Sequence, residues 1–418
     1  MQRVRMSLPY YRENGWDPVV LAIDAEVHGG PQEMALSATV PPDVPIIRCG
    51  ALPRRLSRWL RIGNLGLRAW LPLLLRGGRA IRREKIDLVF LSNSQFLTFT
   101  LGRLWRFWHG VPYVIDLQDP WRTDQHERPG AGKPPGGWKY QLARLQAWLL
   151  EGWSFRRMAA MMSVSQNYLD DLGARYRWFA AIPTEVIRFG ASDADLLAAR
   201  NLPSVAAAPT SEPPKVRFVY TGVAIVPHAL EVLFGGLRQF REAFPQEAAR
   251  LQFEFVGTSY AAPEHALESI LPIAQRFGVA DLVREAPRRL GHLESLQMQA
   301  GADVLLLIGS RDPAYSPSKL YPYYLSGRPI LAVVFEHSYL ASLLADLACA
   351  EVVCFREEGP FEAAFARLRS FFQAALEKFP PGTLPPRNDA LFRKEYLAAT
   401  LTARQCALFD RAVTPLAK

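Results

Sequence analysis

PYVIDLQD (residues 112–119) decides the fold class, because its apolar residues are nearly consecutive up to a polar end. A strand whose apolar residues run together rather than alternate is typically buried on both faces, as in a parallel sheet. PVVLAID (18–24), IDLVFLS (86–92) and AAMMSVS (159–165) have the same character, and a helical stretch separates each from the next. This alternation predicts a parallel sheet with helices on both faces.

The same alternation begins again after a Pro-, Ala- and Ser-rich passage, NLPSVAAAPTSEPPK (201–215). The strand-like runs of this second part are VRFVYTG (216–222), LQFEFVG (251–257), ADVLLLIG (302–309), PILAVVF (329–335) and AEVVCF (350–355). We therefore predict an α/β protein with two doubly wound, Rossmann-like domains that face a cleft. The N-terminal domain covers 1–200, a linker covers 201–215, and the second domain covers 216–390.

The composition fits two globular domains. The chain has 418 residues, of which 49% are hydrophobic and 21% charged, so it is too apolar to be disordered. Its four cysteines form no CxxC pair and have no histidine at metal-ligand spacing, which fits a reducing compartment and predicts no metal site. The longest apolar runs, such as 69–75, are far shorter than the roughly 20 residues that span a bilayer. We expect a cytoplasmic protein.

Residues 51–85 form a distinct basic and apolar segment. They contain ten Lys or Arg residues against one Glu, interleaved with Trp59, Trp70 and leucines. This pattern suits a helix that lies on an anionic membrane surface, where each basic residue contributes about 1 kcal/mol. A solvated helix face over ordinary core leucines is an equally good interpretation. Nucleic acid is not expected as a partner, because no recognisable nucleic-acid module accompanies the charge.

Candidate ligand-binding residues follow the strands, because ligands of open α/β sheets lie beyond the carboxyl ends of the strands. In the first domain, Asp119 is the candidate for a catalytic base or for holding a substrate hydroxyl. The alternative is that Asp116 or Asp119 only caps the turn before Pro120. The other polar residues of this edge are Ser92, Asn93, Ser94, Arg122, Asp124 and Ser165.

The second domain offers residues suited to an anion. Helix starts are expected at Pro227 and at Ser316–Ser318, where free N–H groups can face a phosphate. Lys319 adds a positive charge in the first turn of the second helix, which opposes the helix dipole unless an anion is bound. Gly222 and Gly257 are turns where a diphosphate could approach the backbone. The alternative for Lys319 is a surface lysine beside a capping serine.

Other known site motifs are absent from the sequence. GAGKPPGG (130–137) has proline where a P-loop requires Ser or Thr, and no GxGxxG follows a strand. There is also no GxSxG elbow and no His-Glu-x-x-His pair. These absences argue against a dinucleotide oxidoreductase and against the common hydrolases, and we expect no cofactor.

The chain resembles the retaining family-4 glycosyltransferases of the GT-B fold, especially bacterial ones that build surface polysaccharides. The motifs that carry the resemblance, in order, are RVRMSLPYYRENGWDPVVLAID, GVPYVIDLQDPWRTD, MSVSQNYLDDL, FVYTG, FEFVGT, RLGHLESLQMQAGADVLLL and SPSKLYPYYLSGRPILAV. The resemblance implies a nucleotide-diphosphate sugar donor in the second domain and an acceptor in the first. The predicted acceptor-side residues are Asp116, Arg122, Asp124 and Ser94, beside the catalytic candidate Asp119. The resemblance also implies metal-independent transfer with retained configuration, and a C-terminal helix (391–418) that packs back onto the first domain.

The resemblance also assigns donor residues. Lys319, in its Pro-Ser-Lys context, matches the family's phosphate-facing lysine, and His292 lies in the segment that borders the nucleotide base. The full predicted donor set is Thr221, Gly222, Gly257, His292, Ser318, Lys319 and Tyr321.

The sequence departs from the family at two places. Pro322 stands where the family has a glutamate that holds the donor ribose. Tyr321, Tyr323 or Asp312 could replace it, or the helix could begin later and bind the donor less tightly. The family's opening strand and Gly-rich turn also have no counterpart before the first helix, so we expect the natural chain to begin upstream of Met1.

We therefore expect a glycosyltransferase at the inner membrane face that transfers sugar to a lipid-linked or other glycan acceptor in cell-surface polysaccharide synthesis. One alternative is a non-catalytic protein that binds sugar nucleotides or serves as a scaffold, which Pro322 and the short N-terminus favour. Another is a GT-B-type nucleotide-sugar epimerase, although no paired carboxylates stand at convincing positions for it.

Overall fold

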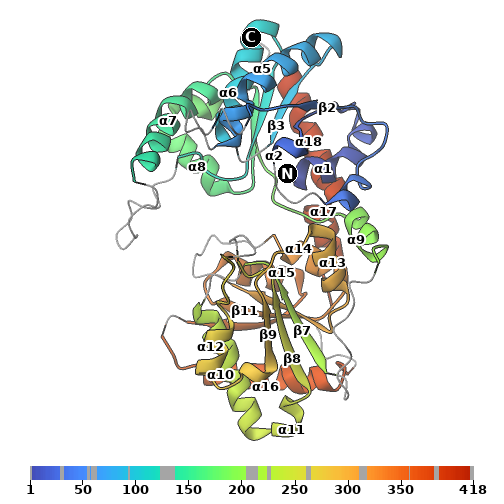
Figure 1. Cartoon of the computed structure of the whole chain (residues 1–418), viewed down its shortest axis with the longest axis vertical. Helices are drawn as coiled ribbons and strands as arrows, with labels where there is room; N and C mark the ends of the chain where they lie inside the picture. Colours follow the sequence, from blue (N-terminus) through green and yellow to red (C-terminus); the bar gives the residue numbers. More distant parts are fainter. Residues whose placement is uncertain are drawn as a thin grey trace. The chain divides into compact units, whose positions relative to one another are not determined.

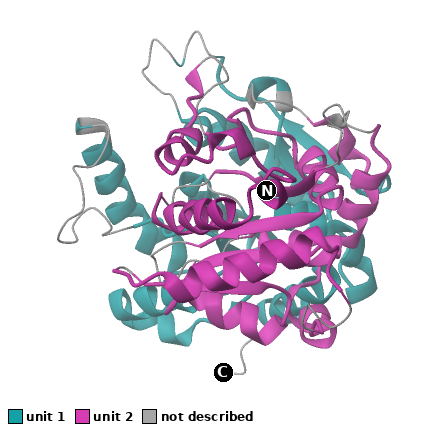
Figure 2. Ribbon diagram, turned by 90° about the horizontal axis from the view of Figure 1, so that it is seen from below, with its two compact units in different colours: residues 1–32, 40–189, 398–418 teal, residues 33–39, 190–397 magenta. Residues whose placement is uncertain are grey.

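The computed structural model describes residues 2–28, 33–53, 57, 64–92, 95–122, 137–203, 215–223, 227–259, 265–309, 318–356, 358–380 and 386–414. The chain divides into two compact units, which Figures 1 and 2 show. Unit 1 contains residues 1–32, 40–189 and 398–418, and unit 2 contains residues 33–39 and 190–397.

Unit 1 is built on two parallel ladders of strands. β1 (Val20–Ile23) pairs with β2 (Ile46–Cys49), and a separate sheet has the order β3-β4-β5-β6. The strands of this sheet are β3 (Val89–Ser92), β4 (Tyr113–Leu117), β5 (Ala160–Ser163) and β6 (Thr184–Val186). The helices of unit 1 are α1 (Gln2–Ser7), α2 (Ala25–His28), α5 (Leu65–Arg83), α6 (Phe99–His109), α7 (Trp138–Phe155), α8 (Gln166–Arg175) and α18 (Ala398–Val413).

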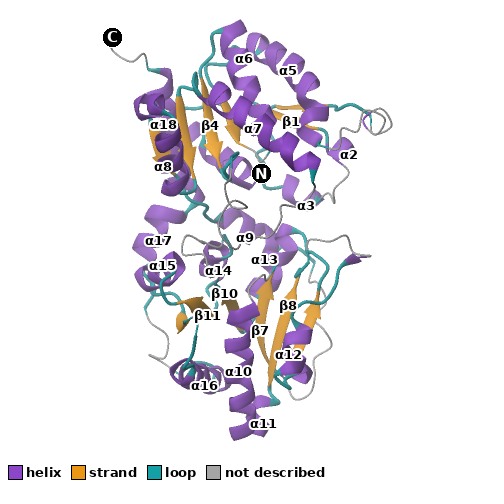
Figure 3. Cartoon of the chain, turned by 90° about the vertical axis from the view of Figure 1, so that its left-hand side faces the viewer, coloured by secondary structure: helices purple, strands orange, loops and turns teal. Residues whose placement is uncertain are grey.

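Helices cover both faces of the four-stranded sheet (Figure 3). On one face, Trp105 of α6 and Phe155 of α7 pack in one core cluster with Ile115 of β4. On the other face, Phe409 of α18 packs in a second cluster with Val114. Successive residues of β4 thus enter different clusters, so the strand is buried on both faces, as its consecutive apolar residues predict.

Unit 2 contains a six-stranded parallel sheet with the order β12-β11-β10-β7-β8-β9. Its strands are β7 (Val216–Thr221), β8 (Leu251–Val256), β9 (Val283–Ala286), β10 (Val304–Ile308), β11 (Ile330–Phe335) and β12 (Glu351–Phe355). Its helices are α3 (Met34–Ser37), α9 (Asp193–Arg200), α10 (Pro227–Ala243), α11 (Pro245–Ala248), α12 (Leu271–Arg276), α13 (His292–Ala300), α14 (Leu320–Ser326), α15 (Tyr339–Leu347), α16 (Glu362–Leu376) and α17 (Asp389–Tyr396).

The order of the strands in unit 2 reverses between β7 and β10. From β7 the chain adds β8 and β9 on one side, and it then returns to add β10, β11 and β12 on the other. Helices α10 and α16 pack on each other over one face, where they share a core cluster with Phe218 and Phe253. A strand-order reversal of this kind is where open α/β sheets bind ligands. The loops after β7 and β10 therefore carry the candidate site.

The nine strands that the sequence predicts are all present, and β2, β6 and β9 are short strands that it does not predict. The fold class is confirmed: both units are α/β with parallel sheets, and α18 returns to unit 1, where it contacts α1, β4 and β5. The structure divides the chain differently from the predicted boundaries, because α9 and residues 33–39 belong to unit 2. In the described part of the chain, no helix is long and apolar enough to cross a membrane.

Candidate functional site

Three loops of unit 2 meet at the carboxyl ends of β7, β8 and β9. Gly222 follows β7 with φ +100°, and Gly257 follows β8 with φ +77°. The Gly222 N–H donates to the Val256 carbonyl at 2.7 Å, and the Gly257 N–H donates to the Ala286 carbonyl at 2.8 Å. A Cβ atom on Gly257 would lie 3.6 Å from the backbone of Gly222. These positive φ angles suit glycine, and the missing side chains let the turns after β7 and β8 approach each other closely at the strand ends.

Lys319 reaches this edge from the residue directly before α14. Its Nζ donates hydrogen bonds to the Tyr220 hydroxyl and, at 3.2 Å, to the Val223 carbonyl. The same ammonium lies 4.0 Å from the centre of the Tyr220 ring, in cation–π geometry. A Cβ atom on Gly222 would lie 3.0 Å from Lys319 Cε, so the glycine makes room for the lysine.

The Lys319 ammonium lacks a carboxylate partner among the described residues. Burial of the amine lowers the pKa of Lys319 to about 7, because desolvation disfavours the charged form. A half-buried cation without a counter-ion has lost part of its hydration, and a bound anion would offset that cost. The arrangement therefore suits a ligand that carries negative charge.

Pro322 is the third residue of α14, which begins at Leu320. Proline is tolerated there because an N–H in the first turn has no intrahelical acceptor. The sequence predicts the helix start at Ser316–Ser318. In the structure α14 begins later, at Leu320, so Lys319 lies just before the helix. Asp312 and Ser316 lie outside the described residues, whereas Ser318 is described and exposed.

The tyrosines on either side of Pro322 lie in the core of unit 2. Tyr321 is 1% exposed and stacks on Tyr396 with ring centres 4.9 Å apart. Tyr323 is fully buried, and its hydroxyl accepts the Thr221 N–H at 3.2 Å. The Thr221 hydroxyl is also buried and accepts from Gln299 of α13 at 2.8 Å. Thr221 and Tyr321, two members of the predicted donor set, are thus buried and pack beneath the carboxyl ends of the strands. A direct contact of either residue with a ligand stays a prediction.

His292 begins α13, and its contacts come from two distant segments. Its N–H and that of Leu293 each donate to the Glu33 carboxylate at 2.6 Å. Its ring Nε2 lies 3.0 Å from Asp195 Oδ2, on a carboxylate that is almost fully buried. Negative charge at a helix start is favourable. Glu33 thus fixes the first turn of α13, and a base-binding role for His292 stays a prediction.

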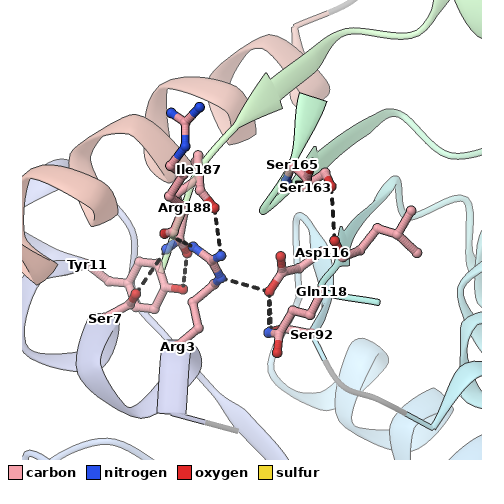
Figure 4. A network of polar contacts seen from close by, with 12 residues as sticks. Arg3, Ser7, Tyr11, Ser92, Asp116, Gln118, Ser163, Ser165, Ile187 and Arg188 are labelled. Atoms are coloured by element: carbon pink, nitrogen blue, oxygen red, sulfur yellow. Dashed lines mark hydrogen bonds and ion pairs between the residues drawn. The ribbon is translucent and has the colours of Figure 1, made fainter. Parts of the chain in front are cut away.

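Asp116 of unit 1 lies at the end of β4 and is fully buried. Its Oδ2 pairs with Arg3 Nε at 2.9 Å and accepts hydrogen bonds from Ser92 at 2.7 Å and Gln118 at 2.6 Å. Arg3 also donates to the Ile187 carbonyl at 2.7 Å, as Figure 4 shows. Asp116 is therefore an internal anchor that ties α1 to three strand ends. Because Asp116 is 0% exposed, none of its atoms is accessible for the predicted contact with an acceptor.

Asp119 is exposed two residues after β4, and it has no hydrogen-bond partner in the described part of the chain. The loop around it is anchored by its neighbours. The Trp121 ring stacks on Phe96 at 5.8 Å between ring centres, and the Arg122 N–H donates to Glu151 at 3.1 Å. Ser94 and Asp124, the other predicted acceptor residues, lie outside the described residues.

Glu151 of α7 is the buried partner of this loop. It accepts from Arg175 at 2.7 Å and from the Tyr176 hydroxyl at 3.1 Å. Burial raises the pKa of Glu151, while the Arg175 guanidinium opposes the rise. Sequence reasoning misses Arg3, Glu33 and Glu151, because each is an ordinary charged residue in its local context and acts through partners far along the chain. The described residues contain no group of three His, Cys, Asp or Glu side chains that could hold a metal.

Comparison with known proteins finds a family model that is similar to the first part of the chain. Residues 2–190 match the model of the glycosyl transferase 4-like domain. No curated protein matches the sequence. Among solved structures, Anabaena Alr3699/HepE in complex with UDP and glucose has 17% identity and a TM-score of 0.55, with 97% of this chain and 94% of that chain covered.

Two further solved structures are similar at lower identity. A putative UDP-N-acetylglucosamine 2-epimerase from Listeria monocytogenes has 12% identity and a TM-score of 0.50, with 99% of this chain and 93% of that chain covered. A structure of trehalose-6-phosphate from E. coli bound with UDP-2-fluoro glucose has 12% identity and a TM-score of 0.50, with 94% of this chain and 99% of that chain covered. The chain has the GT-B fold, and residues 2–190 are similar to the glycosyl transferase 4-like domain.

Proposed function

We propose that the protein is a retaining, metal-independent glycosyltransferase that moves a sugar from a nucleotide-diphosphate sugar to a glycan acceptor. The observation that carries the proposal is the half-buried ammonium of Lys319, which has no carboxylate partner among the described residues. It lies beside Gly222, in the turn after β7, where the strand order reverses. The glycosyl transferase 4-like domain over residues 2–190 supports the reaction class.

The chemistry of the donor edge follows from charge. When the sugar departs, its nucleoside diphosphate gains negative charge, and fixed donors that face this charge lower the barrier. Lys319 supplies a cation, Gly222 and Gly257 admit the phosphates to the backbone, and Ser318 offers a hydroxyl. Thr221, Tyr321 and His292 hold the shape of this edge.

On the acceptor side, Asp119 is the proposed catalytic residue. Its carboxylate would accept the proton of the attacking hydroxyl or hold that hydroxyl near the anomeric carbon. Arg122 and the undescribed Ser94 and Asp124 complete the proposed acceptor set. Asp116 positions this loop from inside rather than through contact with the acceptor.

A UDP-sugar is the first donor to test, because the Anabaena protein of the same fold was solved with UDP and glucose. The proposed acceptor is a lipid-linked or other glycan of cell-surface polysaccharide synthesis, reached from the cytoplasmic side. The basic segment 51–85 supports a peripheral place at the inner membrane face, because the exposed side of α5 joins leucines to arginines.

A thermal-shift panel of UDP-, GDP-, TDP- and ADP-sugars tests donor binding. We expect one nucleotide class to raise the melting temperature, and Lys319→Ala to weaken this effect more than Asp119→Asn does. Asp119→Asn should instead abolish transfer to an acceptor. Stabilisation by none of the four classes would overturn the proposal.

The same assay separates the alternatives. A non-catalytic binding protein would be stabilised by a sugar nucleotide but would release no nucleoside diphosphate with any acceptor extract. An epimerase would change the configuration of the sugar without an acceptor, which chromatography of the recovered sugar nucleotide detects.

A further inference from the structure

Helix α7 turns large apolar side chains outward. Leu145, Trp148 and Leu149 are 52%, 60% and 54% exposed, whereas its buried residues are Ala147, Glu151, Ser154 and Phe155, of which only Phe155 is large and apolar. A helix on the surface of a globular protein normally places polar side chains on its outward side. Large exposed apolar patches mark surfaces that contact a partner or a membrane.

The exposed apolar side chains continue onto the neighbouring helices. α6 contacts both α5 and α7, and the three helices cover the same face of the four-stranded sheet (Figure 3). Phe107 at the end of α6 is 81% exposed, and Leu71 and Leu75 of α5 are 53% and 51% exposed. We call the set Leu71, Leu75, Phe107, Leu145, Trp148 and Leu149 the outer face of unit 1.

The charges on these helices have one sign. The exposed basic residues of α5 are Arg76, Arg79, Arg82 and Arg83, and Arg144 of α7 is also exposed. The one acid among the described side chains of α5, α6 and α7 is Glu151, which is buried and paired with Arg175 at 2.7 Å. The outer face therefore presents aromatic and leucine side chains among arginines, without exposed carboxylates on its own helices.

We propose that the outer face of unit 1 docks the protein on an anionic lipid bilayer. Trp148, Phe107 and the leucines enter the boundary between headgroups and acyl chains, and the arginines meet the anionic headgroups. An amphipathic helix that lies on a membrane has the same combination of apolar and cationic side chains. Here three packed helices contribute these side chains to one face. The purpose of the docking rests on the proposed function, since it would bring a transferase to a lipid-linked acceptor.

Charge complementarity favours a bilayer over a second copy of the chain. Two outer faces that meet would bring like charges together, because each carries the arginines of α5 and α7. An anionic bilayer instead gains from each arginine near its surface. The surface extends beyond the basic segment 51–85, because its most exposed aromatic and leucine residues belong to α6 and α7.

Vesicle flotation of the full chain tests the proposal. The probes are phosphatidylcholine vesicles with and without about 30 mol% phosphatidylglycerol. The test variant is Leu145→Gln/Trp148→Gln/Leu149→Gln, and the matched control is Leu267→Gln, which changes an 80% exposed leucine of unit 2. A second variant, Arg76→Gln/Arg79→Gln/Arg82→Gln, removes charge alone. Because all these side chains are exposed, circular dichroism melting should show that each variant folds.

We expect the wild type and the leucine control to float with anionic vesicles. The triple α7 variant should bind roughly tenfold or more weakly, since binding scales with buried apolar area. The arginine variant should lose the preference for phosphatidylglycerol, and binding of the wild type should fall as salt rises from about 0.05 M to about 0.5 M.

Two outcomes overturn the proposal. In the first, the α7 variant floats as well as the wild type. In the second, the wild type does not float, whether or not light scattering then shows a dimer that the α7 variant splits. Thermal shift with UDP-glucose separates this test from the donor proposal. Vesicle binding without donor binding would contradict the proposed enzyme activity and support the membrane-docking surface. Donor binding without vesicle binding would contradict the docking surface and support the proposed donor site.

Discussion

The ammonium of Lys319 lies over the Tyr220 ring, 4.0 Å from its centre, and donates a hydrogen bond to the hydroxyl of the same tyrosine. Tyr220 belongs to β7 and Lys319 directly precedes α14, so the contact joins β7 to the segment between β10 and α14, where the strand order reverses. The aromatic ring favours the charged amine, but it replaces only part of the lost hydration. The lysine is therefore held in place while its charge is left for a ligand to neutralise.

Binding of UDP-glucose should weaken as the pH rises above 7. Burial lowers the pKa of free Lys319 to about 7, and a bound diphosphate would raise that pKa by stabilising the charged form. Below pH 7 the lysine is already protonated. Above pH 7 binding must take up a proton, so the affinity should fall by up to about tenfold per pH unit. Isothermal titration between pH 6 and pH 9 measures this slope.

Lys319→Arg is the control for the pH slope, because a guanidinium stays charged throughout this range. UDP-glucose is the right ligand because its diphosphate is esterified at both ends, so it lacks the ionisation near pH 6 of a terminal phosphate. A flat profile in the wild type would show that Lys319 does not face the diphosphate.

The strands could be predicted from the sequence wherever burial is complete. β4, β10 and β11 are nearly continuous apolar runs, and each is found where its run predicts. β2 and β9 could not be predicted in this way, because they are partly exposed and carry charged residues, as in VREA over Val283–Ala286. Periodicity reports burial, so it misses strands that are only half buried.

The candidate site was predictable only in part. Lys319, Gly222 and Gly257 are found at the expected edge because strand ends fix where the following residues lie. Asp116 follows the same rule, yet Arg3 occupies its carboxylate, and nothing in the local sequence links residues so far apart. Residues 33–39 likewise join unit 2 through contacts that no local pattern encodes.

Loss of either partner of the Arg3–Asp116 pair should destabilise unit 1. Both side chains are buried, so Asp116→Asn or Arg3→Met would leave one charge without its partner, at a cost of about 3–5 kcal/mol. The double variant Arg3→Met/Asp116→Leu should recover much of this loss, since it removes both charges. Urea unfolding with fluorescence detection gives the free energies of unfolding.

The exposed pair Arg238–Glu242 is the matched control for the buried pair. Its side chains are 55% and 61% exposed, so Glu242→Gln should change stability by about 0.5 kcal/mol or less. Equal effects at the two pairs would mean that Arg3 and Asp116 are solvated and that the anchor does not exist.

Glu33→Gln should loosen the first turn of α13. The carboxylate accepts two backbone N–H groups at 2.6 Å, and the substitution replaces charge-assisted bonds with neutral ones, at a cost of about 1–3 kcal/mol. Hydrogen exchange at His292 and Leu293 should become faster. Glu362→Gln is the control, because Glu362 is an exposed acid in the first turn of α16. This substitution should lower the free energy of unfolding by less than about 1 kcal/mol. Unchanged exchange at both amides would contradict the assigned contact.

Gly222→Ala should weaken UDP-glucose binding beyond its effect on stability. The substitution strains a backbone at φ +100° and places a Cβ atom 3.0 Å from Lys319 Cε, so the lysine must move. Gly15→Ala separates the two effects, because Gly15 has φ +80° but nothing within 4 Å of an added Cβ. Both variants should lose about 1–2 kcal/mol of stability from backbone strain. Only Gly222→Ala should also lower the affinity for UDP-glucose, because only there does the new methyl group displace the cation. Equal affinities in the two variants would place the diphosphate away from Lys319 and the turn after β7.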